Sequence, residues 1–337
     1  MLSRTADNLF WMARYIERAE NTARVLDVAH RTSLLPLDLE GPEAEAYLWF
    51  APLNISGSAH GYETKYGLAR RHAVNRYMAL DPENPASIYT CLWQARENAR
   101  AVRGAITSEM WEVINATWLE VSRLSRNLDD EKLPDFFDWV KDRSHLFRGV
   151  TLGTILKDLG LSFCKLGTFL ERADNTARIL DVKYHILISE VGSVDSAADY
   201  YQWGALLKSV SSFEAYRKIY RDVITPLRVA EIMILREDMP RSLHACMNEV
   251  EAALIEINGT SGREARRRAG EMHAALHFGR IEDVFEQGVH DYLIQFINNA
   301  NVLGQEIREA YLARRDQFSV STIKKSSQTQ FATAGSR

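Results

Sequence analysis

The segment Tyr15-Ile-Glu-Arg-Ala-Glu-Asn-Thr-Ala-Arg-Val-Leu-Asp-Val28 occurs again, 154 residues later, as Phe169-Leu-Glu-Arg-Ala-Asp-Asn-Thr-Ala-Arg-Ile-Leu-Asp-Val182. Ten of the fourteen positions are identical, and the other four exchange similar side chains. Similarity at a fixed offset indicates an internal duplication. The sequence therefore predicts that two copies of one unit make up most of the chain.

Weaker matches extend the duplication beyond this segment. They keep the offset of 154 residues at first, and it becomes 155 further along the chain. The matched positions are Tyr62 with Tyr216, and Pro85-Ala-Ser87 with Pro240-Arg-Ser242. One residue was therefore gained between the blocks, and the repeated unit is about 150 residues long.

The repeat predicts how the chain is divided. We expect a first helical repeat over residues 1–150 and a second over 151–315, packed together as one intertwined domain. A pseudo-two-fold axis is the natural relation between two such copies. Residues 316–337 are rich in Ser, Thr, Gln and Lys, a composition that predicts a disordered tail.

Both copies of the segment have the spacing of an amphipathic helix, because apolar or small residues recur every three or four positions. These residues are Leu9, Met12, Ile16, Ala19, Ala23 and Leu26 in the first copy, and Phe163, Leu166, Leu170, Ala173, Ala177 and Leu180 in the second. Pro and Gly, which weaken helices, account for only 8 and 18 of the 337 residues. The sequence therefore predicts an all-α helical bundle.

The same spacing predicts further helices. One runs through the block from Tyr201 to Tyr216, and others cover about 107–128, 134–146 and 264–315. Pro85 and Pro240 are expected in the first turn of two equivalent helices, where a missing N–H costs nothing.

Composition excludes several classes of function. The net charge of −4 and the lack of a basic stripe argue against nucleic-acid binding. No apolar run approaches the roughly 18 residues that span a bilayer, so we expect no membrane insertion. Cys91, Cys164 and Cys246 form no CxxC pair, which favours free buried thiols and a cytoplasmic location.

The repeated helix carries a charged stripe. Glu17, Asn21 and Arg24 stand at i, i+4 and i+7, on one face beside the alanines. The second copy repeats the arrangement with Glu171, Asn175 and Arg178. Arg18 and Arg172 project about 100° away from the glutamates.

Three interpretations of this stripe stay open. In the first, the groups form buried ion pairs across the pseudo-two-fold axis, for example Glu17 with Arg178 and Glu171 with Arg24. In the second, they line a pocket for an anionic or peptide-like ligand that the arginines clamp. In the third, they form a docking surface for another protein.

A third polar cluster consists of Arg96, Glu97, Asn98 and Arg100. Its counterpart, Glu249-Val-Glu-Ala-Ala253, lacks the arginines. The cluster is therefore either part of an asymmetric site or a solvated helix face of alternating charge.

Motifs for metal and cofactor chemistry are weak or missing. His273 and His277 have the i, i+4 spacing of metal ligands, but no HExxH motif occurs, and we expect neither a metal site nor a cofactor. The chain also has no GxSxG elbow and no phosphate-binding glycine loop.

Together, the segments Glu17-Arg-Ala-Glu-Asn-Thr-Ala-Arg24, Asn84-Pro-Ala-Ser-Ile88 and Leu170-Glu-Arg-Ala-Asp174 resemble the bacterial alpha-E domain proteins, over residues 1–315. The resemblance implies a predominantly helical protein without an established activity. Genes of that family commonly accompany a circularly permuted ATP-grasp ligase and a transglutaminase-like protease. As ligand-binding candidates, the resemblance marks Glu17, Arg18, Asn21, Arg24, Glu171, Arg172, Asn175, Arg178, Arg96, Glu97, Asn98 and Arg100.

Three functional hypotheses follow from the residues and the resemblance. The first is an accessory partner of an ATP-grasp-type amide ligase, which binds the ligase or its peptide substrate. The second is an enzyme of that pathway, with Glu17 or Glu171 as general acid–base and Arg24 or Arg178 as anion clamp. The third is a structural scaffold or homo-oligomer whose charged helices form a buried ion-pair network.

Overall fold

The computed structural model describes residues 1–33, 42–126, 128–189, 197–258 and 260–312. Within these ranges the chain forms fifteen α-helices, two short 3-10 helices and no strand, which confirms the predicted all-α class. The expected tail, residues 316–337, lies outside the described residues. None of the described helices is long and apolar enough to cross a membrane.

The helices of the described residues form two runs, each of which begins with a helix of 31 residues. The first half contains α1 (Ser3–Ser33), α2 (Pro42–Ile55), α3 (Ala59–Tyr66), α4 (Arg71–Leu80), α5 (Ile88–Ala101), α6 (Ser108–Leu124), η1 (Asp130–Lys132) and α7 (Leu133–Thr154). The second contains α8 (Leu159–Ser189), α9 (Ala197–Ser209), α10 (Phe213–Tyr220), α11 (Pro226–Ile234), α12 (Leu243–Ile257), η2 (Thr260–Gly262), α13 (Arg263–His277), α14 (Ile281–Gln287) and α15 (Val289–Tyr311). The pseudo-two-fold axis and the boundaries between the repeats stay predictions.

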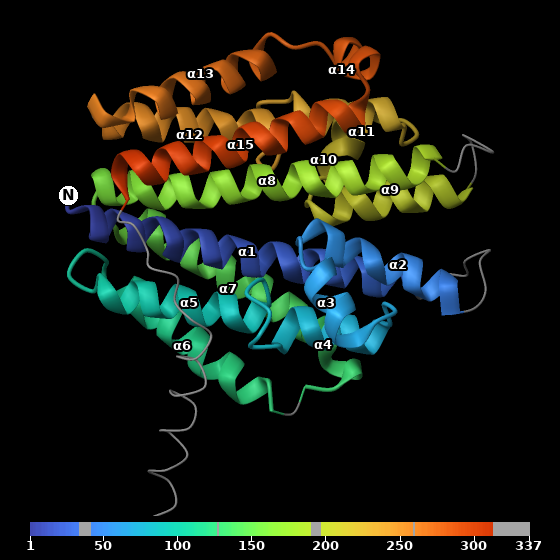
Figure 1. Ribbon diagram of the computed structural model, residues 1–337, viewed down its shortest axis with the longest axis horizontal. Helices are drawn as coiled ribbons and strands as arrows, with labels where there is room; N and C mark the ends of the chain where they lie inside the picture. Colours follow the sequence, from blue (N-terminus) through green and yellow to red (C-terminus); the bar gives the residue numbers. More distant parts are fainter. Residues whose placement is uncertain (34–41, 127, 190–196, 259, 313–337) are drawn as a thin grey trace, which may run out of the picture.

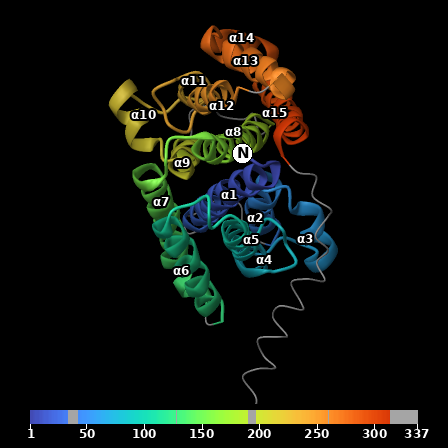
Figure 2. The same cartoon turned by 90° about the vertical axis from the view of Figure 1, so that its left-hand side faces the viewer.

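The two copies of the repeated segment form the centre of the molecule. Helices α1 and α8 are each 31 residues long and lie side by side, running in the same direction (Figure 1). Their contacts advance together along both helices, from Leu9 with Cys164 to Arg18 with Glu171. Helices α5 and α7 pack on α1, whereas α12 and α15 pack on α8. In Figure 2, the remaining helices accordingly lie on the two sides of this central pair.

The predicted apolar faces are buried as expected. All twelve residues of the two seams lie in the core, at most 5% exposed. Small residues let the helix backbones approach closely: a Cβ atom on Gly167 of α8 would lie 2.1 Å from the carbonyl oxygen of Phe10 on α1. The three cysteines are free and buried, and burial raises the pKa of each thiol to about 12.

The predicted starts of α5 and α12 were wrong. Pro85 and Pro240 lie before these helices, whose N-caps are Ser87 and Ser242. Each serine hydroxyl accepts a hydrogen bond from a backbone N–H in the first turn, at 3.1 Å in α5 and 2.9 Å in α12. A capping side chain satisfies the helix end directly, which a proline cannot do.

Two long predicted helices are interrupted. The block from Tyr201 to Tyr216 breaks between α9 and α10, where Ser211 adopts a φ of 55°. The range 264–315 is divided into α13, α14 and α15, and Gly288 between the last two has a φ of 94°. A residue in the left-handed region ends an α-helix whatever the periodicity on either side.

Candidate functional site

The parallel register of α1 and α8 places two Glu-Arg pairs opposite each other. Glu17 accepts two hydrogen bonds from Arg172, both 2.9 Å long. Reciprocally, Glu171 accepts two from Arg18, at 2.5 and 2.9 Å. Such paired contacts fix both the distance and the register of the two helices.

The predicted pairs Glu17–Arg178 and Glu171–Arg24 were therefore wrong. In parallel helices that are in register, residues seven positions apart are offset by about 10 Å along the axis. Arg24 instead pairs with Glu20, and Arg178 with Asp174, each one turn earlier on its own helix. Arg18 and Arg172, expected to point elsewhere, make the contacts between the helices.

The charged groups around Glu17 and those around Glu171 form two centres, which differ in how completely they are enclosed by neighbouring side chains. Glu17 and Glu20 are 1% and 0% exposed, and Arg241 donates hydrogen bonds to both. Arg148 of α7 also contacts both carboxylates. Burial raises the pKa of Glu17, but the charges of Arg172 and Arg241 outweigh it, and the net pKa is lowered. This centre is a closed ion-pair network.

The second centre lies around Glu171. Arg14 and Arg18 both donate hydrogen bonds to its carboxylate. Burial by itself raises the pKa of Glu171, but these two charges lower it to about 2. Glu171 is therefore ionised at neutral pH.

A cavity of about 250 Å³ opens beside this second centre, between α1, α8 and the end of α2. It brings together five of the predicted site residues, namely Arg18, Asn21, Glu171, Asn175 and Arg178. Arg14, Asp174 and Asn301 also line it, and the sequence analysis missed them. Glu17, Arg24 and Arg172 are not among its lining residues.

Two buried polar atoms of cavity-lining residues have no hydrogen-bond partner within the described part of the chain. One is Nδ2 of Asn21, a residue only 2% exposed whose Oδ1 accepts a hydrogen bond from Arg241. The other is Oδ1 of Asp174, whose Oδ2 accepts one from Arg178. A buried donor or acceptor without a partner costs about 1–3 kcal/mol. The residues that carry these atoms line the cavity, but the two atoms themselves are covered, so a ligand reaches them only after a side-chain rotation.

Matching positions of the two sequence copies differ beside the two centres. Ala86 and Arg241 occupy matching positions, each directly before the serine cap of α5 or α12. The guanidinium of Arg241 fills the space beside Glu17 and Glu20, whereas Ala86 lines the cavity with a methyl group. This difference between the copies accompanies the change from a closed centre to an open one, together with others such as Asp174 at the position that matches Glu20.

The third predicted cluster lies elsewhere. Arg96 donates a hydrogen bond to Asn115 of α6 and pairs with Glu97, which also pairs with Arg100. Asn98 is buried, and its side chain donates to the carbonyl oxygen of Gln94. The Arg96–Asn115 contact joins α5 to α6, the other three lie within α5, and none of the four residues is among those that line the cavity.

Metal-ligating side chains gather outside the cavity. His244, His273 and His277 are the group of this kind in the described ranges. The sequence analysis considered only the last two.

Comparisons with known proteins place the chain among uncharacterised relatives. A family model described as a predicted alpha-helical domain with a conserved ER motif matches residues 1–312. The Glu-Arg dipeptide occurs twice here, at Glu17-Arg18 and Glu171-Arg172, the two pairs that join α1 to α8.

Uncharacterised proteins of Mycobacterium bovis and Mycobacterium tuberculosis are 25% identical over 328 residues. The match covers 92% of this chain but only 36% of each relative, so the chain spans about a third of their length. No solved structure matches.

Proposed function

This chain belongs to the Alpha-E family, and we propose that its cavity between α1 and α8 binds a small ligand carrying both a carboxylate and an amino group, such as an amino acid or a short peptide. The observation that carries the proposal is the cavity lined by Arg14, Arg18 and Arg178. Asn21 and Asp174 lie in the same wall, and each has one covered side-chain atom without a partner in the described ranges.

The charges of the lining favour an anionic group on the ligand. Arg14, Arg18 and Arg178 face the carboxylates of Glu171 and Asp174, which leaves one positive charge in excess. A guanidinium pairs well with a carboxylate. After side-chain rotations that uncover them, Nδ2 of Asn21 would donate to the same ligand oxygen and Oδ1 of Asp174 would accept from an ammonium group. The cavity volume of about 250 Å³ suits a small ligand.

Calorimetric titration with the dipeptide alanyl-alanine tests this proposal. We expect binding of the free dipeptide, weaker binding after acetylation of its amino group, and weaker binding after amidation of its carboxylate. Asp174→Asn is expected to abolish the preference for the free amino group. Asp222→Asn, which alters a surface pair with Arg228 outside the cavity, serves as the matched control. Equal binding of all three ligands, or no binding, contradicts the proposal.

A cavity-filling variant provides a second test. Ala86→Arg introduces the side chain that the matching position already carries as Arg241. We expect it to abolish dipeptide binding while the helical circular dichroism spectrum is kept. Ala101→Arg, at an exposed position at the end of α5, is the control for the added charge. Undiminished binding by Ala86→Arg would show that the ligand site lies elsewhere.

We further propose that this binding serves an amide-bond-forming pathway, with the chain as an accessory partner of an ATP-grasp-type ligase. Two considerations support it. One is the family resemblance. The other is that the matched region makes up only 36% of each mycobacterial relative and so is part of a longer polypeptide there. Cross-linking and affinity purification from the native cell is expected to recover such a ligase. Repeated recovery of none contradicts the accessory role but leaves the dipeptide test unaffected.

The pKa values favour binding over acid–base catalysis. A general base works best with a pKa near the operating pH. The arginines around Glu17 and Glu171 lower the pKa of both carboxyls, to about 2 for Glu171. Both groups are thus held as charged, fully paired structural anions.

A further inference from the structure

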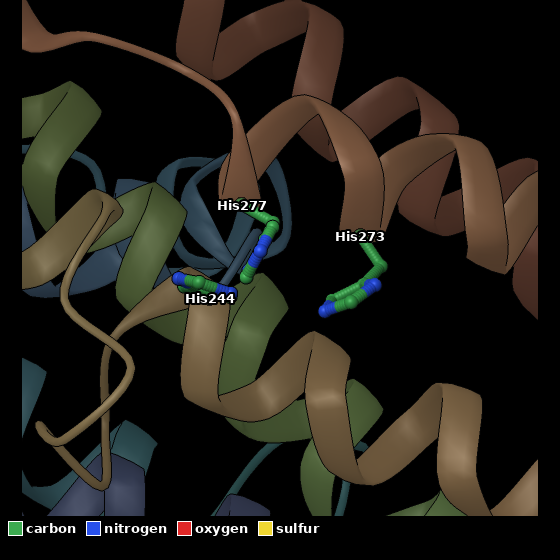
Figure 3. Close-up of side chains that lie close together, drawn as sticks. All are labelled: His244, His273 and His277. Carbon is green, nitrogen blue, oxygen red and sulfur yellow. The ribbon is translucent and has the colours of Figure 1, made fainter.

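Three histidine side chains from two helices lie close together, and none of them lines the cavity. His244 lies in the first turn of α12, and His273 and His277 lie one turn apart on α13. One potential ligand atom from each residue lies within 4.8 Å of those of the other two. Figure 3 shows the three rings gathered in the space between the two helices.

The ring of His244 is held in one tautomer. Its Nδ1 lies 2.8 Å from the carbonyl oxygen of Leu235, which can only accept, so Nδ1 carries the proton. The opposite nitrogen, Nε2, therefore bears a lone pair. This atom is buried, in a residue only 4% exposed, and has no hydrogen-bond partner among the residues that the structure describes.

The ring of His273 is oriented in the same manner by a carboxylate. Its Nδ1 lies 2.7 Å from Oε2 of Glu251, one helix away on α12. A histidine that donates one ring N–H to a carboxylate or a carbonyl presents its other nitrogen as a ligand atom, the usual outer-shell arrangement of metal-binding histidines. Two of the three rings thus have such a partner.

His277 leaves one side of the cluster accessible. Its side chain is exposed, and its ring packs edge-on against that of Phe278. The exposed ring of His277 therefore places one side of the cluster at the protein surface. No fourth His, Cys, Asp or Glu joins the group in the described ranges.

We propose that His244, His273 and His277 bind a divalent transition-metal ion, with Zn²⁺ as the best match, and leave one coordination position open to water or a ligand. Three imidazoles suit zinc in a four-coordinate site with one open position. Zn–N bonds of about 2.0–2.1 Å require nitrogens about 3.3 Å apart. The three ligand atoms now lie within 4.8 Å of one another, so binding requires them to move closer together by rotation of the side chains.

This proposal reverses the expectation drawn from the sequence. The i, i+4 spacing of His273 and His277 was visible there, but His244 precedes the nearer of the two by 29 residues. Only the packing of α12 against α13 brings it to the other two.

The test uses the full chain purified without a polyhistidine tag, titrated with Zn²⁺ in competition with a chromophoric chelator. We expect one tight Zn²⁺ site per chain. His277→Ala removes an exposed ligand and is expected to fold normally and lose this site. His72→Ala removes an exposed histidine that also pairs with a carboxylate, that of Asp130, and is expected to bind Zn²⁺ as the unchanged chain does.

The carboxylate of Glu251, which contacts His273, provides a second test with an intermediate expected effect. Glu251→Gln is expected to weaken Zn²⁺ binding by about 10–100-fold without abolishing it. Bound Co²⁺ is expected to show the intense visible absorption of a four-coordinate site, and His277→Ala to remove it. Zn²⁺ affinity unchanged in His277→Ala, or a Co²⁺ spectrum identical to that of the hydrated ion, would overturn the proposal.

Discussion

At the scale of single residues, the buried charges between α1 and α8 couple the stability of the fold to pH. Glu171 has an ordinary pKa of 4.5 and a pKa of about 2 in the folded chain, because Arg18 and Arg14 outweigh the effect of burial. The ionised carboxylate therefore contributes stability above pH 4.5. As the pH falls from 4.5 to about 2, the unfolded chain takes up a proton first, and this stability is lost.

We accordingly expect acid to destabilise the protein in this window, with about 3 kcal/mol attributable to Glu171. Glu171→Gln is expected to flatten the dependence of the free energy of unfolding on pH between 4.5 and 2. Urea unfolding at a series of pH values measures this dependence. Glu264→Gln, which alters an exposed pair on α13, is the control. An identical slope in the Glu171 variant and the unchanged chain would show that the pair is not coupled to folding.

Arg241 is the residue whose removal should destabilise the chain most. It is 6% exposed and neutralises both Glu17 and Glu20, which are themselves buried. Breaking a buried ion pair from one side costs about 3–5 kcal/mol, because the partner charge stays buried. Thermal and urea unfolding of Arg241→Ala measure this loss.

The comparison for Arg241→Ala is Arg228→Ala. Arg228 pairs with Asp222 at the surface, where such a pair contributes about 0–1 kcal/mol. Similar small losses in both variants would contradict a structural role for the network around Glu17.

At the scale of elements, periodicity predicted α1 and α8 well because a long amphipathic seam is a property of the local sequence. It did not predict where α9 ends or where α13, α14 and α15 separate. These breaks depend on the backbone conformation at a few positions, such as Ser211 and Gly288. The spacing of apolar residues does not reveal this conformation.

The close contact of α1 with α8 makes Gly167 a sensitive position. A methyl group there would collide with the backbone of Phe10, so Gly167→Ala is expected to lower the free energy of unfolding by at least about 1–3 kcal/mol. Gly149 on α7 has open space around its Cβ position. There the same substitution is expected to stabilise the helix by about 0.5–1 kcal/mol. Opposite signs in urea unfolding are the expected result, and a stabilised Gly167→Ala would contradict the close approach.

At the scale of the whole molecule, each half carries charges that the other half neutralises. Glu17 and Glu20 need Arg241 from the second half, and Glu171 needs Arg14 and Arg18 from the first. The apolar seam of α1 is likewise buried against α8.

We therefore expect residues 1–157 and 158–337, expressed separately, to lack a cooperative unfolding transition. Mixing the two fragments is expected to restore one. Circular dichroism during thermal unfolding measures both outcomes. A cooperative transition in either fragment alone would show that the repeats are independent domains, contrary to the predicted intertwined arrangement.

The sequence by itself determined the helical class, the duplication and the Glu-Arg residues at its centre. Helical spacing and repetition can both be recognised from the order of residues along the chain. Only the tertiary structure decided which arginine meets which glutamate. That choice follows from the parallel register of α1 and α8, which lie more than 150 residues apart in the chain. It also decided that Arg241 closes one centre while Ala86 leaves a cavity at the other, and that His244 joins two distant histidines. Such sites depend on packing between remote segments, which local patterns do not encode.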